Sequence, residues 1–136
     1  MIRYEEWIKR AKGSLDLAKT KIIYDINYED LCYQAQQSAE KAFKGLLIYF
    51  EVEPEFTHSI EKLIEELIKF TEVPENIKAA TDLTMYAVST RYPGSYDAIT
   101  KEEYEKAIKT AEDCLEWVNK TIKDIEEQKT KPHSSE

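Results

Sequence analysis

Residues 35–47 read AQQSAEKAFKGLL, from Ala35 to Leu47, and place two glutamines, one acid and two lysines among small and apolar residues. Around them, core-type residues recur every three or four positions and predict a helix over about 29–51. The members of this stripe are Leu31, Ala35, Ser38, Ala42, Leu46 and Tyr49. Because several of these side chains are small, a neighbouring helix can approach closely. We therefore expect this helix to be the central element of a bundle.

The polar side chains of the same helix form a second stripe. Gln37, Glu40, Lys41 and Lys44 are three and four positions apart, so they share one face. In one interpretation this face is solvated and carries a weak Glu40–Lys44 ion pair. In the other, the two lysines supply charge and Gln36 and Gln37 supply amide groups to a nucleotide or partner groove. The spacing leaves both interpretations open.

Four further helices are predicted, one before the central helix and three after it. Apolar periodicity predicts helices over 4–22 and, after Pro54, over a short segment whose core residues begin at Ile60. Thr57 or Ser59 can cap this short helix. A fourth helix is expected from Pro74 to about Ser89. The pair Thr100 and Glu103 has the spacing of a capping box and predicts the start of a long last helix.

The predicted fold class is therefore all-α. We expect a five-helix antiparallel up-and-down bundle with four long helices and one short helix. One domain spans residues 1–128, and the polar tail 129–136 is expected to be disordered.

Charge restricts the partners that the protein can bind. Its 136 residues carry 27 acids and 19 bases, which gives a net charge of −8. A negative field repels phosphate backbones, and arginine, the preferred side chain for nucleic-acid recognition, occurs three times. We therefore expect no DNA binding and regard RNA as a less favoured ligand. Residues 1–24 carry +3, which makes the first helix a candidate basic face, with a solvated helix face as the alternative.

Cysteine usage and hydropathy indicate the compartment. Cys32 and Cys114 lie far apart without a CxxC pair, no secretory leader is recognisable, and no apolar run reaches membrane-spanning length. We expect a reduced, cytoplasmic protein that does not bind membranes.

Few catalytic motifs fit the sequence. Glu55 and His58 have the Glu-x-x-His spacing of di-metal bundles, but such sites need a second copy and further glutamates. We therefore expect no metal site. Gly-x-Ser-x-Gly is absent, and the three glycines are too scattered to form a phosphate-binding loop.

Three separated stretches resemble the HEPN family, a group of prokaryotic helical domains. One is the alanine-rich run of the central helix, the second is the Thr-His start of the short helix, and the third is an Arg-Tyr-Pro turn. The matching residues are Gln36, Gln37, Ala39, Glu40, Lys41, Ala42, Lys44, Leu46, Leu47, Thr57, His58, Leu63, Arg91, Tyr92 and Pro93. The resemblance covers roughly residues 4–122 and agrees with the five predicted helices.

The resemblance implies a bundle that commonly dimerises and associates with nucleotides or RNA. It also implies a frequent partner, a separately encoded minimal nucleotidyltransferase, in a toxin–antitoxin arrangement. Ribonuclease members look to carry an arginine followed after four to six residues by histidine. After Arg91 the corresponding positions are Tyr96, Asp97 and Ala98, so this motif is absent.

The sequence thus favours a non-catalytic, nucleotide-associated HEPN protein that acts as partner or regulator of a minimal nucleotidyltransferase. Two alternatives are a ribonuclease toxin with atypical catalytic residues and a helical adaptor without a small-molecule site. A nucleotide is the ligand expected, and no other cofactor is predicted. The candidate nucleotide- or partner-binding residues are Gln36, Gln37, Glu40, Lys41, Lys44, His58, Arg91, Tyr92 and Tyr96. For Arg91 and Tyr92 the alternative is a helix-capping turn.

Nine tyrosines suggest a surface that a partner buries. Several of them lie with Trp7 near predicted helix ends, namely Tyr4, Tyr24, Tyr28, Tyr33 and Tyr49. We expect some of these side chains to form a homodimer interface. The alternative is packing at the edge of the core with the hydroxyl groups in water.

Overall fold

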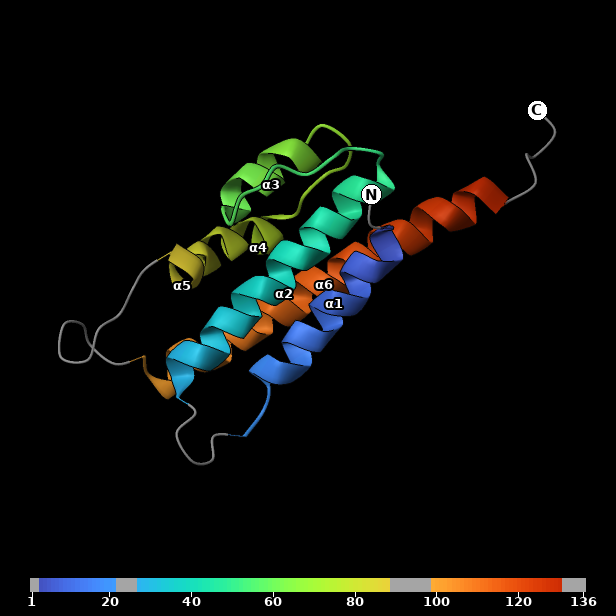
Figure 1. The fold of residues 1–136 in the computed structure, drawn as a ribbon. Helices are drawn as coiled ribbons and strands as arrows, with labels where there is room; N and C mark the ends of the chain where they lie inside the picture. Colours follow the sequence, from blue (N-terminus) through green and yellow to red (C-terminus); the bar gives the residue numbers. More distant parts are fainter. Residues whose placement is uncertain (1–2, 22–26, 89–98, 131–136) are drawn as a thin grey trace.

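Helix α2 lies at the centre of the computed structural model, which describes residues 3–21, 27–88 and 99–130. It packs against α1 and α6, and α3, η1 and α5 cover it further (Figure 1). The described elements are α1 (Tyr4–Ala18), α2 (Tyr28–Tyr49), α3 (Ile60–Leu67), α4 (Glu75–Lys78), the 3-10 helix η1 (Ala79–Thr84), α5 (Met85–Val88) and α6 (Lys101–Thr130). The predicted all-α bundle is therefore confirmed.

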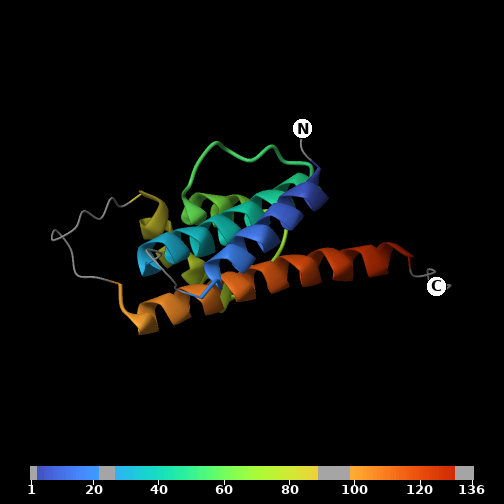
Figure 2. The same ribbon diagram turned by 60° about the horizontal axis from the view of Figure 1, so that its bottom comes forward.

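The three long helices among the described residues, α1, α2 and α6, do not all run in the same direction. Helix α1 runs antiparallel to α2, and α6 runs in the same direction as α2 (Figures 1 and 2). Between α2 and α6 the sequence contains α3, α4, η1 and α5. Helix α6 then begins at the same end of the bundle as α2. None of the helices in the described residues is long and apolar enough to cross a membrane.

Side-chain caps explain where several helices begin. Asn27 Oδ1 accepts from Asp30 N at 3.3 Å, and Asp30 Oδ2 accepts from Asn27 N, which makes a capping box at the start of α2. The capping box predicted at Thr100 and Glu103 is present, with Glu103 N donating to Thr100 Oγ1 at 3.0 Å. Of the two candidate caps for α3, Ser59 occupies the N-cap.

The predicted fourth helix is interrupted, so the expectation of one continuous helix was wrong. Its middle is the 3-10 helix η1, between the single α-helical turns α4 and α5. Ile77, Ala80 and Leu83 are buried and three residues apart. A 3-10 helix has three residues per turn, so this spacing keeps all three on the core side. Ser89 lies outside the described residues.

Two predicted helix ends also differ from the structure. Helix α1 ends at Ala18 with Lys19 as its C-cap, and Ile22 lies outside the described residues. Helix α6 continues through Lys129 and Thr130, two residues into the predicted tail, and Lys129 pairs there with Glu126 at 3.2 Å.

Four bases of the candidate basic face of α1 form ion pairs. Arg3, Arg10 and Lys12 each pair with an acid of the same segment, and Lys19 pairs with Glu112 of α6 at 2.8 Å. Exposed pairs of this kind contribute little stability. The acids of the first three pairs are already counted in the +3 of residues 1–24, so only the pair with Glu112 lowers the net charge of the face.

Several tyrosines pack within the chain. Tyr4 meets Tyr49 edge-on at 5.1 Å between ring centroids, and Tyr28 stacks on Tyr104 at 4.9 Å. The Tyr104 hydroxyl donates to the Ala18 carbonyl at 2.7 Å. Internal packing thus accounts for these four rings, and Tyr24 lies outside the described residues. The homodimer stays a prediction.

Close contact between α1 and α2 depends on small residues of α2. Ser38 Oγ donates to the Ala11 carbonyl of α1 at 2.9 Å. A Cβ atom at Gly45 would lie 3.1 Å from Trp7 Cβ and 3.2 Å from Ile8 Cγ1. In contrast, a Cβ atom at Gly13 would meet no atom within 4 Å.

These two glycines predict opposite effects of substitution. Gly13→Ala should raise the free energy of unfolding by about 0.5–1 kcal/mol, because alanine is the better helix former. Gly45→Leu should lower it by about 1–3 kcal/mol, because the larger side chain forces α1 away from α2. Urea unfolding of both variants measures the difference, and equal effects at the two positions would contradict the packing described.

Candidate functional site

The polar stripe of α2 is organised around the carboxylate of Glu40. Lys44 Nζ donates to Glu40 Oε2 at 2.8 Å, and Gln36 Nε2 donates to Oε1 at 3.0 Å. His58 Nδ1 lies 2.9 Å from Oε1. Gln37 Nε2 donates to Gln36 Oε1 at 2.7 Å. We call these five residues the Glu40 cluster.

The Glu40 cluster is largely buried, so the solvated-face interpretation of the stripe was wrong for its central residues. Gln36, Glu40 and Lys44 are buried, with Glu40 only 4% exposed. Gln37 is partly buried. The Lys44 ammonium also lies 5.8 Å from the centre of the Trp7 ring of α1, within the range of a cation–π contact.

Hydrogen bonds keep Glu40 ionised despite its burial. Burial raises the pKa of Glu40, but hydrogen bonds from Lys44, Gln36 and His58 oppose it, and the net effect is a pKa below the ordinary value of 4.5. Because an ionised carboxylate only accepts hydrogen bonds, His58 Nδ1 is the donor. When the ring is neutral, Nε2 then carries the lone pair, on a side chain that is 55% exposed.

The cluster also ties the chain between α2 and α3 to α2. Gln36 Nε2 donates to the His58 backbone carbonyl at 3.1 Å, in addition to its bond with Glu40. His58 is therefore held through both its ring and its backbone. This segment leads into α3 through Ser59.

Lys41 lies apart from the Glu40 cluster, although the sequence places it on the same stripe. Its Nζ donates to Ser14 Oγ of α1 at 3.0 Å. Burial lowers the pKa of Lys41 despite the Glu40 charge, and the nearby Arg10 charge lowers it further. The hydrogen-bond partner of the Lys41 ammonium is thus the neutral hydroxyl of Ser14, and the Glu40 charge acts on it from nearby.

The structure thus brings together Gln36, Gln37, Glu40, Lys44 and His58, and separates Lys41 from them. Arg91, Tyr92 and Tyr96 lie outside the described residues. The described residues contain no group of three or more histidine, cysteine, aspartate or glutamate side chains arranged to hold a metal ion.

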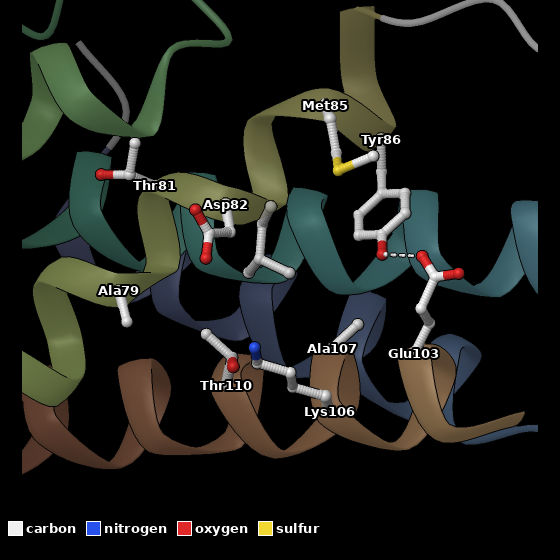
Figure 3. A pocket seen from close by; sticks show the side chains of 10 residues that line it. Ala79, Thr81, Asp82, Met85, Tyr86, Glu103, Lys106, Ala107 and Thr110 are labelled. Carbon is white, nitrogen blue, oxygen red and sulfur yellow. Dashed lines mark hydrogen bonds between the residues drawn. The ribbon is translucent and has the colours of Figure 1, made fainter. Parts of the chain in front are cut away.

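A hollow of about 450 Å³ lies between η1, α5 and α6 and was not expected from the sequence (Figure 3). Asp82 enters it from η1, and Lys106 enters it from α6. The Tyr86 hydroxyl donates to Glu103 at 3.3 Å on one side. The volume suits a small molecule. One wall of the hollow is formed by η1. The feature of the sequence that relates to this wall is the three-residue spacing of Ile77, Ala80 and Leu83, which is compatible with a 3-10 helix.

The Glu40 cluster predicts a pH-dependent contribution to stability. The folded pKa of Glu40 lies below its unfolded value, so the contribution is present above about pH 4.5 and is lost as the pH falls through the folded pKa. Glu40→Gln should lower the free energy of unfolding at pH 7 by about 2–4 kcal/mol, because Lys44 is left buried without a counter-charge.

Urea unfolding from pH 3 to 7 measures this contribution. The double variant Glu40→Gln and Lys44→Met should recover part of the loss, since both charges are then absent. Glu116→Gln, on the exposed face of α6, is the matched control and should change little. A Glu40→Gln variant as stable as the control at pH 7 would contradict the role given to the cluster.

Comparisons with known proteins agree with this architecture. The model of the HEPN domain family matches residues 4–122. A relative from Methanocaldococcus jannaschii, named "Putative toxin MJ1304", is 28% identical over 140 residues, which cover 90% of this chain and 91% of the relative.

Solved structures extend the comparison. ST0689, described as an archaeal HEPN homologue, matches with a TM-score of 0.69 and 34% identity over 90% of this chain and 99% of its own. TT1696 from Thermus thermophilus matches with a TM-score of 0.75 and 32% identity over 88% and 98%. A HEPN domain protein from Thermotoga maritima, at 19% identity and a TM-score of 0.56 over 88% and 93%, supports the fold alone. The family match and these similarities, over nearly the whole chain, show that the protein belongs to the HEPN domain family.

Proposed function

We propose that the protein acts by binding rather than by catalysis, as one component of a toxin–antitoxin-like pair whose other component is a separately encoded minimal nucleotidyltransferase. The similarity to a relative named as a toxin supports the pairing, because it extends over most of both chains. The HEPN resemblance supplies the nucleotidyltransferase as the partner.

The observation that carries the non-catalytic role is the burial of the cation of the Glu40 cluster. A catalytic site needs a base and a cation that a substrate can reach. Lys44, the cation of the cluster, is buried against Glu40, and Gln36 uses its amide on Glu40 and the His58 carbonyl. In addition, no histidine follows Arg91 after four to six residues.

Lys41 is the better candidate for contact with a nucleotide. It is partly buried at the contact between α1 and α2, hydrogen-bonds to a neutral hydroxyl, and lies close enough to Arg10 for the two charges to repel. A phosphate group placed between two cations would be stabilised by both. We therefore propose that any nucleotide bound by this chain contacts Lys41.

A ribonuclease is the second candidate function, and one observation favours it. Glu40 accepts from His58 Nδ1 and thereby orients the ring with Nε2 available as a base. A base held by a carboxylate is the arrangement found in many hydrolytic sites. Cleavage of RNA by such a base would also need a cation near the scissile phosphate.

Binding and cleavage assays separate these functions. We expect the purified protein to form a stable complex with the minimal nucleotidyltransferase of the same organism, measured by isothermal titration calorimetry. We also expect it to leave single-stranded and structured RNA intact. RNA cleavage that disappears in His58→Ala or Arg91→Ala would instead establish the ribonuclease. No complex and no cleavage would reject both functions.

Thermal unfolding with mono-, di- and triphosphate nucleotides tests the ligand. A nucleotide at 100 times its dissociation constant should add about 2.7 kcal/mol and raise Tm by several degrees. The shift should vanish in Lys41→Ala and Arg91→Ala and persist in Lys12→Ala, an exposed lysine of α1. A shift that is lost only in Lys106→Ala would place the ligand in the hollow beside α6.

A further inference from the structure

The chain between α2 and α3 is fixed at both ends. At its start, Glu51 has a φ of 65°, Glu51 N donates to the Ile48 carbonyl at 2.8 Å, and Val52 N donates to the Leu47 carbonyl at 2.9 Å. These are the two hydrogen bonds of a Schellman motif, which reverses the chain at a helix end. At its other end, the Glu40 cluster holds His58.

Between these anchors the segment, residues 51–58, presents one chemical type outward. Val52 and Pro54 are half-buried, and Val52 packs against the core. The three glutamates between and beside them, Glu51, Glu53 and Glu55, are exposed. The alternation places a row of carboxylates on the outer side of the segment, which bulges from the bundle in Figure 2.

Phe56 continues this outer surface with a large apolar side chain. It is fully exposed, at 105% of its reference area, two residues before the anchored His58. An aromatic ring of this size is a typical anchor of a protein interface, because it can fill a pocket of the partner. Since both ends of the segment are already ordered, binding would require less further ordering of the backbone.

The charge of residues 51–58 selects the class of partner. A nucleic acid or an anionic membrane would bring phosphate groups against three glutamates. A second copy of this chain, paired through the same surface, would bring glutamates against glutamates. A protein with lysine and arginine around an apolar pocket complements both features.

We propose that residues 51–58 form the docking surface for a basic protein partner, with Phe56 inserted into an apolar pocket of that partner. This inference rests on the proposed function, because the partner it names is the minimal nucleotidyltransferase. An enzyme that binds nucleoside triphosphates must carry cationic side chains for the phosphates. Cationic side chains on the surface of that enzyme would complement the glutamate row.

Isothermal titration calorimetry of the full chain with the purified nucleotidyltransferase tests the surface. Phe56→Ala should raise the dissociation constant by about tenfold or more, as expected for a central aromatic anchor. The double variant Glu53→Lys and Glu55→Lys should also weaken binding. The affinity of the unsubstituted protein should fall as salt rises, and less steeply for the double variant.

Two controls keep the result specific. Leu17→Ala removes another exposed apolar side chain, 56% exposed on α1, and should leave the affinity unchanged. The double variant Glu116→Lys and Glu127→Lys makes the same charge change on α6 and should have a much smaller effect than the reversal at Glu53 and Glu55. Thermal unfolding of each variant verifies that it is folded, and Phe56→Ala should retain its Tm because the ring is exposed.

The outcomes distinguish the two proposals. A complex of unchanged affinity with Phe56→Ala and with the Glu53 and Glu55 reversal would overturn the docking surface and leave the proposed function standing. Equal weakening by the reversal on α6 would also overturn it, because charge alone would then explain the effect. Absence of any complex with the unsubstituted protein would overturn the proposed function and, with it, the partner assigned to this surface.

Discussion

The buried carboxylate of Glu40 is the constraint on which the arrangement around α2 depends. Helix α2 is covered by neighbours along most of its length, so a charge on it cannot rely on water. Lys44, Gln36 and His58 supply the hydrogen bonds that keep Glu40 ionised. One of these donors lies in the segment before α3, so satisfying the charge also fixes where that segment lies.

The small residues of α2 add a second constraint. Gly45 and Ser38 let α1 approach closely enough for a hydrogen bond between Ser38 and the Ala11 carbonyl. Together, the two constraints explain how α2 contacts both α1 and the segment before α3. Ser38, Glu40 and Lys44 of α2 are therefore engaged in contacts within the protein, which leaves these polar side chains less available to a ligand.

Much of the fold could be predicted from local patterns. The apolar stripes located the helices to within a few residues, and the caps at Ser59 and Thr100 marked two of their starts. The prediction of one continuous α-helix after Pro74 was wrong, because a 3-10 helix also keeps residues three apart on one side. The candidate site was predicted less well. Spacing put Glu40, Lys41 and Lys44 on one face, but Lys41 turns to Ser14 while Lys44 turns to Glu40.

Composition and local spacing are enough to establish the helical class, the family resemblance, the acidic charge and the lack of the Arg–His ribonuclease motif. Packing of the helices buries Gln36, Glu40 and Lys44, lets Glu40 orient the His58 ring, and leaves Phe56 exposed. These features join residues that are far apart along the chain. Helical periodicity relates residues three or four apart, whereas Glu40 and His58 are 18 residues apart and Ser14 and Lys41 are 27 apart. Contacts over such distances exist only once the helices have packed.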